Sequence, residues 1–200
     1  MDADAWDDRY RDAELVWSAG PNMFVEQHCG HLEPGTAIDL AAGEGRNAIW
    51  LAEQGWQATA VDFSEEGVGK ARQIAERRGV TVGTEVADLT HYEPTPGGYD
   101  LVVIAYLQLV DAELTPILRR AAAAVAPGGR LVLVSHDLTN LESGHGGPQH
   151  PAVLTTPDQV VAAISGVLSV EVAEVAERHV QTDDGEKTAL DTVVVAGRPT

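Results

Sequence analysis

Three acidic residues and two glycines carry the chemistry that this sequence suggests. Asp39 closes a short apolar run, and a turn containing Gly43 and Gly45 follows it. Asp62 closes the next such run, and Asp88 follows the third. Glycines let a turn approach a ligand, and the helix after the turn offers unpaired N–H groups. An acid after the second strand can accept hydrogen bonds from ribose hydroxyls, so the set predicts a nucleotide-type cofactor site.

These three acids lie at one edge of a sheet only if the apolar runs that precede them are parallel strands. Short apolar runs bounded by turn residues are typical of buried strands. They occur at residues 36–41, 57–62, 81–86, 99–105 and 130–135. The segments between them predict helices at 47–54, 64–78 and 115–126, the last with Thr115 as N-cap and Pro116 as first helical residue. Strands that alternate with helices predict a mostly parallel sheet.

The C-terminal part follows a different pattern. Strand-like runs at 167–180 and 188–196 are separated by a short turn with Asp184 and Gly185, which predicts an antiparallel hairpin. The expected fold is therefore α/β: a Rossmann-like, mostly parallel seven-stranded sheet with helices on both faces and a C-terminal antiparallel hairpin. Residues 140–157 are rich in glycine and proline and predict a long functional or mobile loop.

The chain length suits one domain. We expect a single domain over residues 1–200, with an N-terminal helical segment at 1–32 acting as a lid and a Rossmann-like core at 33–200. Gly20 and Pro21 interrupt the apolar pattern of the lid and divide it.

Composition narrows the range of partners. The net charge is −18, from 31 acidic and 13 basic residues. Such a surface repels phosphate backbones and anionic membranes, so we expect neither nucleic acid nor membrane as a partner. The acidic start lacks the features of a secretory signal, and a single cysteine, Cys29, allows no intrachain disulfide. These features favour a cytoplasmic protein, and they leave its oligomeric state open.

The motifs together resemble those of the class I S-adenosylmethionine-dependent methyltransferases. The run from Asp39 to Asn47 is similar to the first motif of that family, Val61-Asp62-Phe63-Ser64 to its second-strand acid, and Ala87-Asp88-Leu89 to its adenine motif. The resemblance implies S-adenosylmethionine as cofactor and S-adenosylhomocysteine as product. It implies cofactor contacts from Trp17, Asp39, Ala41, Gly43, Gly45, Asn47, Asp62, Phe63, Ser64, Ala87, Asp88, Leu89 and Ala105. The family often has glycine where this chain has Ala41, so a slightly altered contact is expected there.

The acceptor should lie over the ends of the fourth and fifth strands. The expected pocket residues are Tyr10, Tyr106, Gln108, His136 and His145. Within the family, the segment after Asp39 is closest to the small tellurite-resistance and thiopurine-type methyltransferases. That resemblance suggests His179 as a catalytic base, and Tyr106 is a second catalytic candidate. His28 and His31 lack further ligands at zinc spacing, so no metal site is expected.

The predicted function is methyl transfer to a sulfur, oxygen or nitrogen atom of a small molecule. Two alternatives remain open, namely methylation of a protein or peptide group and cofactor binding without catalysis. A nicotinamide dehydrogenase is also formally possible, because residues 43–48 fit G-x-G-x-x-A. Asp39 ahead of the glycines and the lack of room for a substrate domain weigh against it.

Overall fold

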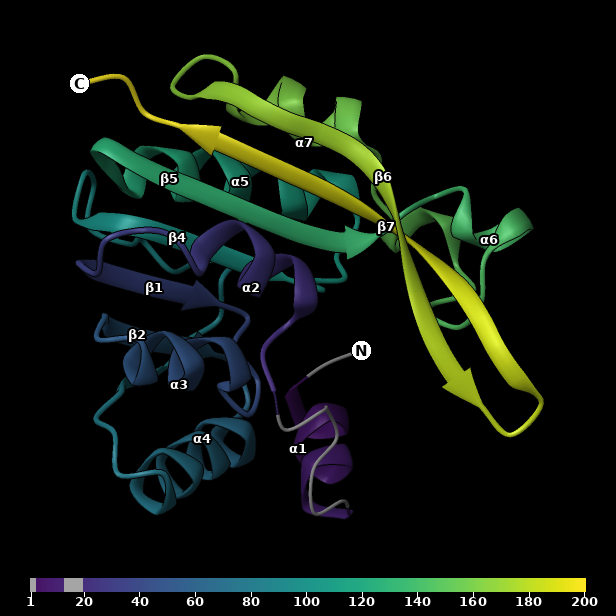
Figure 1. Ribbon diagram of the computed structural model, residues 1–200, viewed down its shortest axis with the longest axis horizontal. Coiled ribbons are helices and arrows are strands. Elements are labelled where there is room, and N and C mark those ends of the chain that lie inside the picture. Colours follow the sequence, from purple (N-terminus) through teal and green to yellow (C-terminus); the bar gives the residue numbers. More distant parts are fainter. Residues whose placement is uncertain (1–2, 13–19) are drawn as a thin grey trace.

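One seven-stranded sheet organises the protein. The computed structural model describes residues 3–12 and 20–200 (Figure 1). Its strand order is β3-β2-β1-β4-β5-β7-β6. The strands are β1 (Thr36–Leu40), β2 (Gln57–Asp62), β3 (Gly83–Val86), β4 (Tyr99–Ala105), β5 (Val125–His136), β6 (Ser169–Thr182) and β7 (Gly185–Gly197).

The strand directions match those expected. The first five strands pair in parallel, whereas β7 pairs antiparallel with both β5 and β6. The α/β fold with a C-terminal antiparallel hairpin is therefore confirmed. Because β1 leads to β2 on one side and the chain later returns to β4 on the other, the order reverses between β1 and β4. Ligands of open α/β sheets bind at the carboxyl ends of strands at such a reversal.

Helices cover both faces of the sheet. They are α1 (Ala3–Asp12), α2 (Met23–Cys29), α3 (Arg46–Glu53), α4 (Glu65–Arg77), α5 (Asp111–Ala124), α6 (Asn140–Ser143) and α7 (Pro157–Ile164). Successive strand residues point to opposite faces. Ile38 packs in the cluster that includes α5 and α7, while its neighbour Ala37 packs in the cluster that includes α2 and α3. The sheet is thus buried on both sides, as parallel sheets require.

The final hairpin extends beyond the rest of the sheet. Pairing of β5 with β7 ends at His136 and Asp191, whereas β6 and β7 remain paired as far as Thr182 and Gly185. Figure 1 shows this two-stranded extension projecting past the end of β5. The projecting strands therefore lie beside the carboxyl ends of β4 and β5.

Three local predictions need correction. Helix α5 begins at Asp111, so Thr115 is not its N-cap and Pro116 lies inside it. The acidic residues Asp111 and Glu113 suit the first turn of a helix, and the start of α5 was missed because proline is so strongly associated with that position. Strand β3 is shorter than expected, and the loop at 140–157 contains α6 and a 3₁₀ turn at Pro151–Val153.

Within residues 3–12 and 20–200, no helix is long and apolar enough to cross a membrane.

Candidate functional site

The glycine turn after β1 is held in an unusual backbone conformation. Ala41, Gly43 and Gly45 all have positive φ, at 63°, 55° and 75°. This region favours glycine, and a non-glycine residue there costs roughly 1–2 kcal/mol. Ala41 therefore keeps the backbone shape of the turn although it carries a methyl group. At Gly45 a Cβ atom would lie 2.8 Å from the Cβ of Ala71, so the packing of α4 also requires glycine there.

Asp62 ties the glycine turn to the end of β2. Its Oδ2 accepts a hydrogen bond of 2.8 Å from the Gly43 N–H, and its Oδ1 accepts one of 2.9 Å from the Ser64 N–H. Burial raises the pKa of Asp62, and these N–H groups oppose the rise. Each carboxylate oxygen can accept more than one hydrogen bond, so ribose hydroxyls can be accommodated as well.

Residues beside Asp62 support the same corner. Ser64 caps α4, since its Oγ accepts from the Gly67 N–H at 2.9 Å, and it also contacts Asp7 of α1. Phe63, between the two, is partly buried. Helix α1 thereby lies against the start of α4, where Tyr10 is buried and stacks on Trp6 at 5.5 Å between ring centroids. Trp17, the expected cover of the methionine portion, lies outside the described residues.

Asp39 is a buried carboxylate without a well-formed hydrogen bond from the part of the chain that the structure describes. It is 1% exposed, and neither of its oxygens makes a hydrogen bond of normal length and angle with a described residue. Burial raises its pKa to about 7, while the Ala48 N–H and the charge of Arg46 oppose the rise. A buried acid without a partner costs free energy. An ammonium group, such as that of the cofactor's methionine portion, would supply the missing donor.

This imbalance gives a prediction for Asp39→Asn. The raised pKa means that the folded state prefers the protonated acid, so its contribution to stability is complete below about pH 4 and is lost as pH rises through about 7. The stability of the variant relative to wild type should therefore increase from pH 5 to pH 8. At pH 8, its affinity for S-adenosylhomocysteine should fall about 10-fold or more, because the ammonium loses an anionic acceptor.

Urea unfolding at both pH values and calorimetry with S-adenosylhomocysteine measure the two effects. The prediction is contradicted if the stability difference is the same at both pH values, or if the affinity is unchanged.

Asn47 links the N-terminal segment to the cofactor turn. This buried residue accepts from the Asn22 N–H at 2.9 Å through its Oδ1. The Asn22 side chain caps α2, accepting from the N–H groups of Phe24 and Val25. The asparagine pair therefore fixes α2 against the start of α3.

The segment after β3 has a structural role that the sequence left open. Ala87 donates its N–H to the Asp62 carbonyl oxygen, and Leu89 is buried in the core. Asp88 is exposed, and its Oδ1 accepts from both the N–H and the hydroxyl of Thr90. These bonds lower the pKa of Asp88 and shape a turn. Its contact with adenine stays a prediction.

A polar cluster lies at the ends of β4 and β5 and beside the middle of β7. Tyr106 directly follows Ala105 and has a φ of 61°. Its hydroxyl donates to Asp191 Oδ2 at 2.9 Å, and its ring lies 4.6 Å from that of His136. His136 Nδ1 is 3.3 Å from Asp191 Oδ1. Burial raises the pKa of Tyr106, and so does Asp191, so the phenol stays protonated and acts as a donor.

Two arginines complete this cluster, and the sequence did not single them out. Arg178 of β6 donates to Asp191 Oδ2 from Nε at 2.6 Å. The guanidinium carbons of Arg46 and Arg178 lie 5.8 and 5.7 Å from the centroid of the Tyr106 ring. Arg46 directly follows Gly45 in the motif and was available to sequence reasoning. No sequence pattern indicated Asp191 or Arg178, because they reach this cluster only through the extension of the β6–β7 hairpin beyond β5.

The remaining predicted residues are more dispersed. His179 is 61% exposed, and its Nδ1 lies 3.6 Å from Glu186 Oε1. Since strand residues alternate in direction and Arg178 points toward Tyr106, His179 points away from the cluster. His145 is exposed in the long loop, and Gln108 is partly buried after β4. The structure does not bring His179 to the predicted catalytic position, and the catalytic role of His179 stays a prediction.

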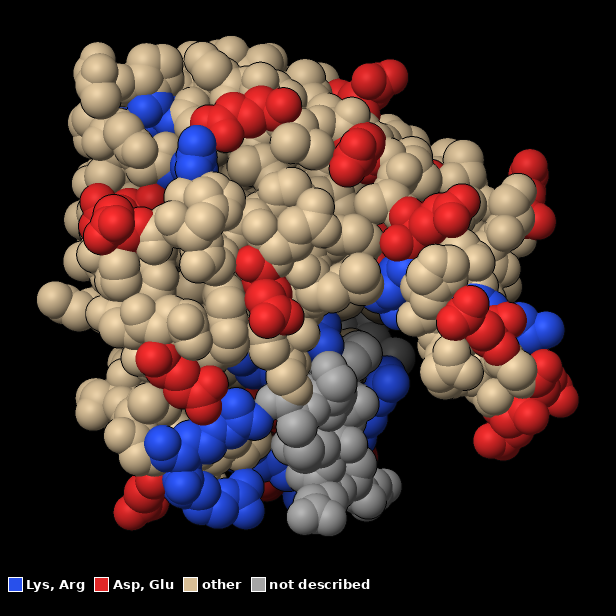
Figure 2. All heavy atoms as spheres, viewed as in Figure 1, with Lys and Arg blue, Asp and Glu red and all other residues tan. Residues whose placement is uncertain are grey.

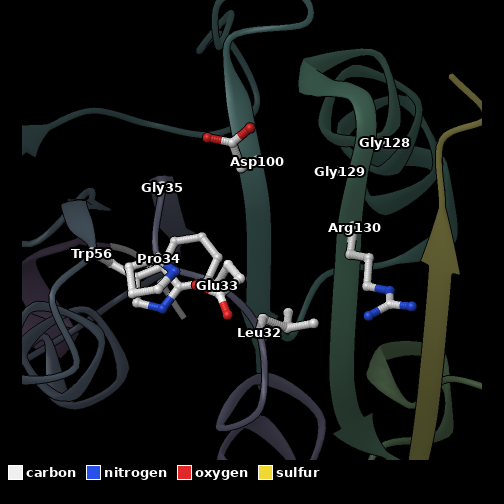
Figure 3. Close-up of a pocket in the computed structure, with 9 residues that line it drawn as sticks. All are labelled: Leu32, Glu33, Pro34, Gly35, Trp56, Asp100, Gly128, Gly129 and Arg130. Atoms are coloured by element: carbon white, nitrogen blue, oxygen red, sulfur yellow. The ribbon is translucent and has the colours of Figure 1, made fainter.

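A separate cavity lies at the opposite edge of the sheet. It has a volume of about 360 Å³ and is lined by Leu32, Glu33, Pro34, Gly35, Trp56, Asp100, Gly128, Gly129 and Arg130 (Figure 3). These residues precede or begin strands, whereas the glycine turn and Tyr106 follow strands. The cavity is therefore remote from the candidate site.

Comparison with known proteins agrees with the geometry. Residues 37–129 match the family described as a methyltransferase domain. Ribosomal RNA small subunit methyltransferase C of Alcanivorax borkumensis is 33% identical over 124 residues, which cover 58% of this chain and 38% of that protein. Demethylmenaquinone methyltransferase of Thermus thermophilus is 34% identical over 103 residues, with coverages of 50% and 47%. The chain thus spans less than half the length of these curated relatives.

A solved structure matches over almost the whole chain. N-methyltransferase NodS from Bradyrhizobium japonicum WM9, in complex with S-adenosylhomocysteine, superposes with a TM-score of 0.73 at 16% identity, covering 99% of this chain and 98% of that one. At that identity the likeness shows the fold. The closer resemblance to tellurite-resistance and thiopurine-type enzymes stays a prediction. The family match, the sheet order and the acids at the strand ends agree, and residues 37–129 belong to a methyltransferase domain of the class I S-adenosylmethionine-dependent type.

Proposed function

We propose that this domain transfers a methyl group from S-adenosylmethionine to a sulfur, oxygen or nitrogen atom of a small molecule held beside Tyr106. The observation that carries the proposal is the buried Asp39 carboxylate next to the Gly43 turn, which makes no hydrogen bond of normal geometry with a described residue. It is an anionic acceptor buried at the reversal point of the sheet, where the cationic cofactor of this family fits.

The cofactor would be held by residues with separate tasks. Asp39 is available for the ammonium group, Asp62 for the ribose hydroxyls, and the turn with Ala41 and Gly43 allows a close approach of the backbone. When bound, S-adenosylmethionine supplies an activated methyl group on its sulfonium. The protein then has to align the acceptor and exclude water.

The side chains around the acceptor mainly orient it rather than react with it. Tyr106 stays protonated and is fixed by Asp191. His136 lies against both of them. We assign His136, rather than His179, as the residue placed to take a proton from an acceptor that arrives protonated. Gly147 of the long loop covers His136, since a Cβ there would lie 3.0 Å from its ring.

A small acceptor is favoured over nucleic acid by charge. The chain has a net charge of −18, which opposes the approach of a phosphate backbone. Several relatives are ribosomal RNA or tRNA methyltransferases by name, so RNA belongs among the substrates tested. We place the activity in the cytoplasm, whose reducing conditions suit the buried free thiol of Cys29.

The test is a turnover assay in which S-adenosylhomocysteine release is measured by mass spectrometry. Thiols, phenols and amines are compared with a ribosomal RNA transcript and a mixture of peptides. We expect turnover with at least one small-molecule class and none with RNA or peptide. Binding of S-adenosylhomocysteine without any turnover would favour a non-catalytic binding protein, and methylation of RNA or peptide alone would contradict the small-molecule assignment.

A further inference from the structure

Part of the positive charge of this strongly acidic molecule lies in a recess beside its C-terminal hairpin. Figure 2 shows some Lys and Arg side chains beside the hollow between the body of the molecule and the projecting β6–β7 hairpin, and a larger group of them on the outer surface at the lower left, while the hairpin carries Asp and Glu together with a few basic side chains. The chain as a whole has 31 acidic residues against 13 basic ones. A basic recess in such a surface attracts anions that the rest of the molecule repels.

Arg178 reaches this recess from the overhang of the hairpin. It pairs with Ala189 in the β6–β7 ladder, beyond the last β5 residue, His136. Its Nε and Nη2 donate to the two oxygens of Asp191 at 2.6 and 3.4 Å. The side chain is 23% exposed, so part of the guanidinium still faces solvent. A guanidinium has five N–H donors, and Asp191 takes only two of those of Arg178.

Arg46 approaches the same ring from the cofactor side. It is the first residue of α3, and the Tyr106 ring lies within 6 Å of both guanidinium carbons. The Asp191 carboxylate beside Arg178 is 0% exposed and already accepts from Tyr106 and Arg178. Asp191 therefore faces the guanidinium of Arg178 and the imidazole of His136. The second guanidinium, that of Arg46, lies beside the Tyr106 ring and within electrostatic range of Asp39.

We propose that the methyl acceptor carries a carboxylate, which Arg178 binds with support from Arg46 beside the Tyr106 ring. The planar fork of arginine matches a carboxylate in geometry, and the partial burial of the site strengthens the pairing. The reacting heteroatom of such an acid then lies near the aromatic pair of Tyr106 and His136. This inference rests on the proposed function and specifies the class of its substrate.

Matched acid and neutral pairs test the inference directly. Salicylate with phenol, anthranilate with aniline and thiosalicylate with thiophenol differ by one carboxylate. Calorimetry is carried out with each compound on the protein saturated with S-adenosylhomocysteine. We expect at least one acid to bind about 10-fold or more tightly than its neutral partner. That preference should weaken as salt is raised.

Variants separate Arg178 from a general effect of charge. Arg178→Gln should remove the preference for the acid, and Arg130→Gln should retain it, because Arg130 pairs with Glu171 beside the cavity at the opposite edge of the sheet. Since Arg178→Gln leaves Asp191 buried without its partner, the double variant Arg178→Gln/Asp191→Asn removes both charges and keeps the test independent of folding. Affinity for S-adenosylhomocysteine should stay within about twofold of wild type in all three variants.

Equal affinity within every pair, including no binding of either member, overturns the inference. A preference for the acid that survives in both Arg178 variants also overturns it. A wild-type chain that binds no S-adenosylhomocysteine contradicts the proposed function instead, so the two failures are distinguishable.

Discussion

Asp62→Ala should reduce the affinity for S-adenosylhomocysteine by about 100-fold or more. The carboxylate holds the N–H groups of Gly43 and Ser64 at 2.8 and 2.9 Å, and the substitution leaves both donors without an acceptor. Hydrogen bonds to a charged group contribute about 1.5–3 kcal/mol each, and their loss frees the turn that approaches the cofactor. The two ribose contacts expected from this acid are lost as well. Calorimetry with S-adenosylhomocysteine measures the effect.

Asp100→Ala is the matched control. Asp100 also accepts a backbone N–H, that of Thr36 at 2.8 Å, together with the Thr36 hydroxyl. It lies at the start of β4, at the opposite edge of the sheet from the glycine turn. Both variants should lower the melting temperature, but only Asp62→Ala should lose affinity for S-adenosylhomocysteine. An affinity within about threefold of wild type in Asp62→Ala would remove Asp62 from the cofactor site.

Asp191→Asn should destabilise the fold by about 3 kcal/mol or more at pH 7. Asp191 is fully buried and receives hydrogen bonds from Tyr106 and Arg178. Removing one member of a buried ion pair leaves an uncompensated charge, which costs about 3–5 kcal/mol. Urea unfolding of the protein without cofactor measures this loss.

The pH dependence of this effect has a definite sign. Burial alone would raise the pKa of Asp191, but His136, Arg178 and Tyr106 together hold it below the usual range. The stabilisation is therefore present above the pKa of an unfolded aspartate, about 4, and is lost as pH falls through the lower value of the folded state. The difference between wild type and Asp191→Asn should shrink below about pH 4.

Glu171→Gln provides the comparison for Asp191→Asn. Glu171 also pairs with an arginine across strands, at 3.1 Å from Arg130, but its side chain is 43% exposed. Exposed ion pairs contribute about 0–1 kcal/mol, so this substitution should have little effect. If the two substitutions destabilised the protein equally, burial of Asp191 would not explain the strength of its ion pair with Arg178.

The cofactor half of the site could be predicted because its signals are local. The run around Asp39, Gly43 and Gly45 needs a strand, a turn and a helix start in immediate succession, and apolar periodicity and glycine identify all three. Asp62 ends the neighbouring strand, and parallel strands bring such ends to one edge of a sheet. The parallel direction of the first five strands followed from the same patterns, whereas the order of the strands came from the structure.

The acceptor half could not be predicted in the same way. Asp191 and Arg178 are far in sequence from Tyr106, and their meeting depends on how far β6 and β7 extend beyond β5. A shift of the hairpin register by one residue would bring His179 inward and turn Arg178 outward, because strand side chains alternate between faces. The resemblance alone favoured His179, one position from the residue that points into the cluster.

By itself, the sequence determined the α/β sheet with its final hairpin, the glycine turn, and the acids at the ends of successive strands, because neighbouring residues encode each of these. Only the tertiary structure decided that Asp39 is a buried carboxylate without a described partner and that Asp88 shapes an exposed turn. It also decided that Arg46 and Arg178 lie beside the Tyr106 ring and that Arg178 and Tyr106 meet at Asp191. Burial and the pairing of distant strands create those environments, and both are properties of the packed chain.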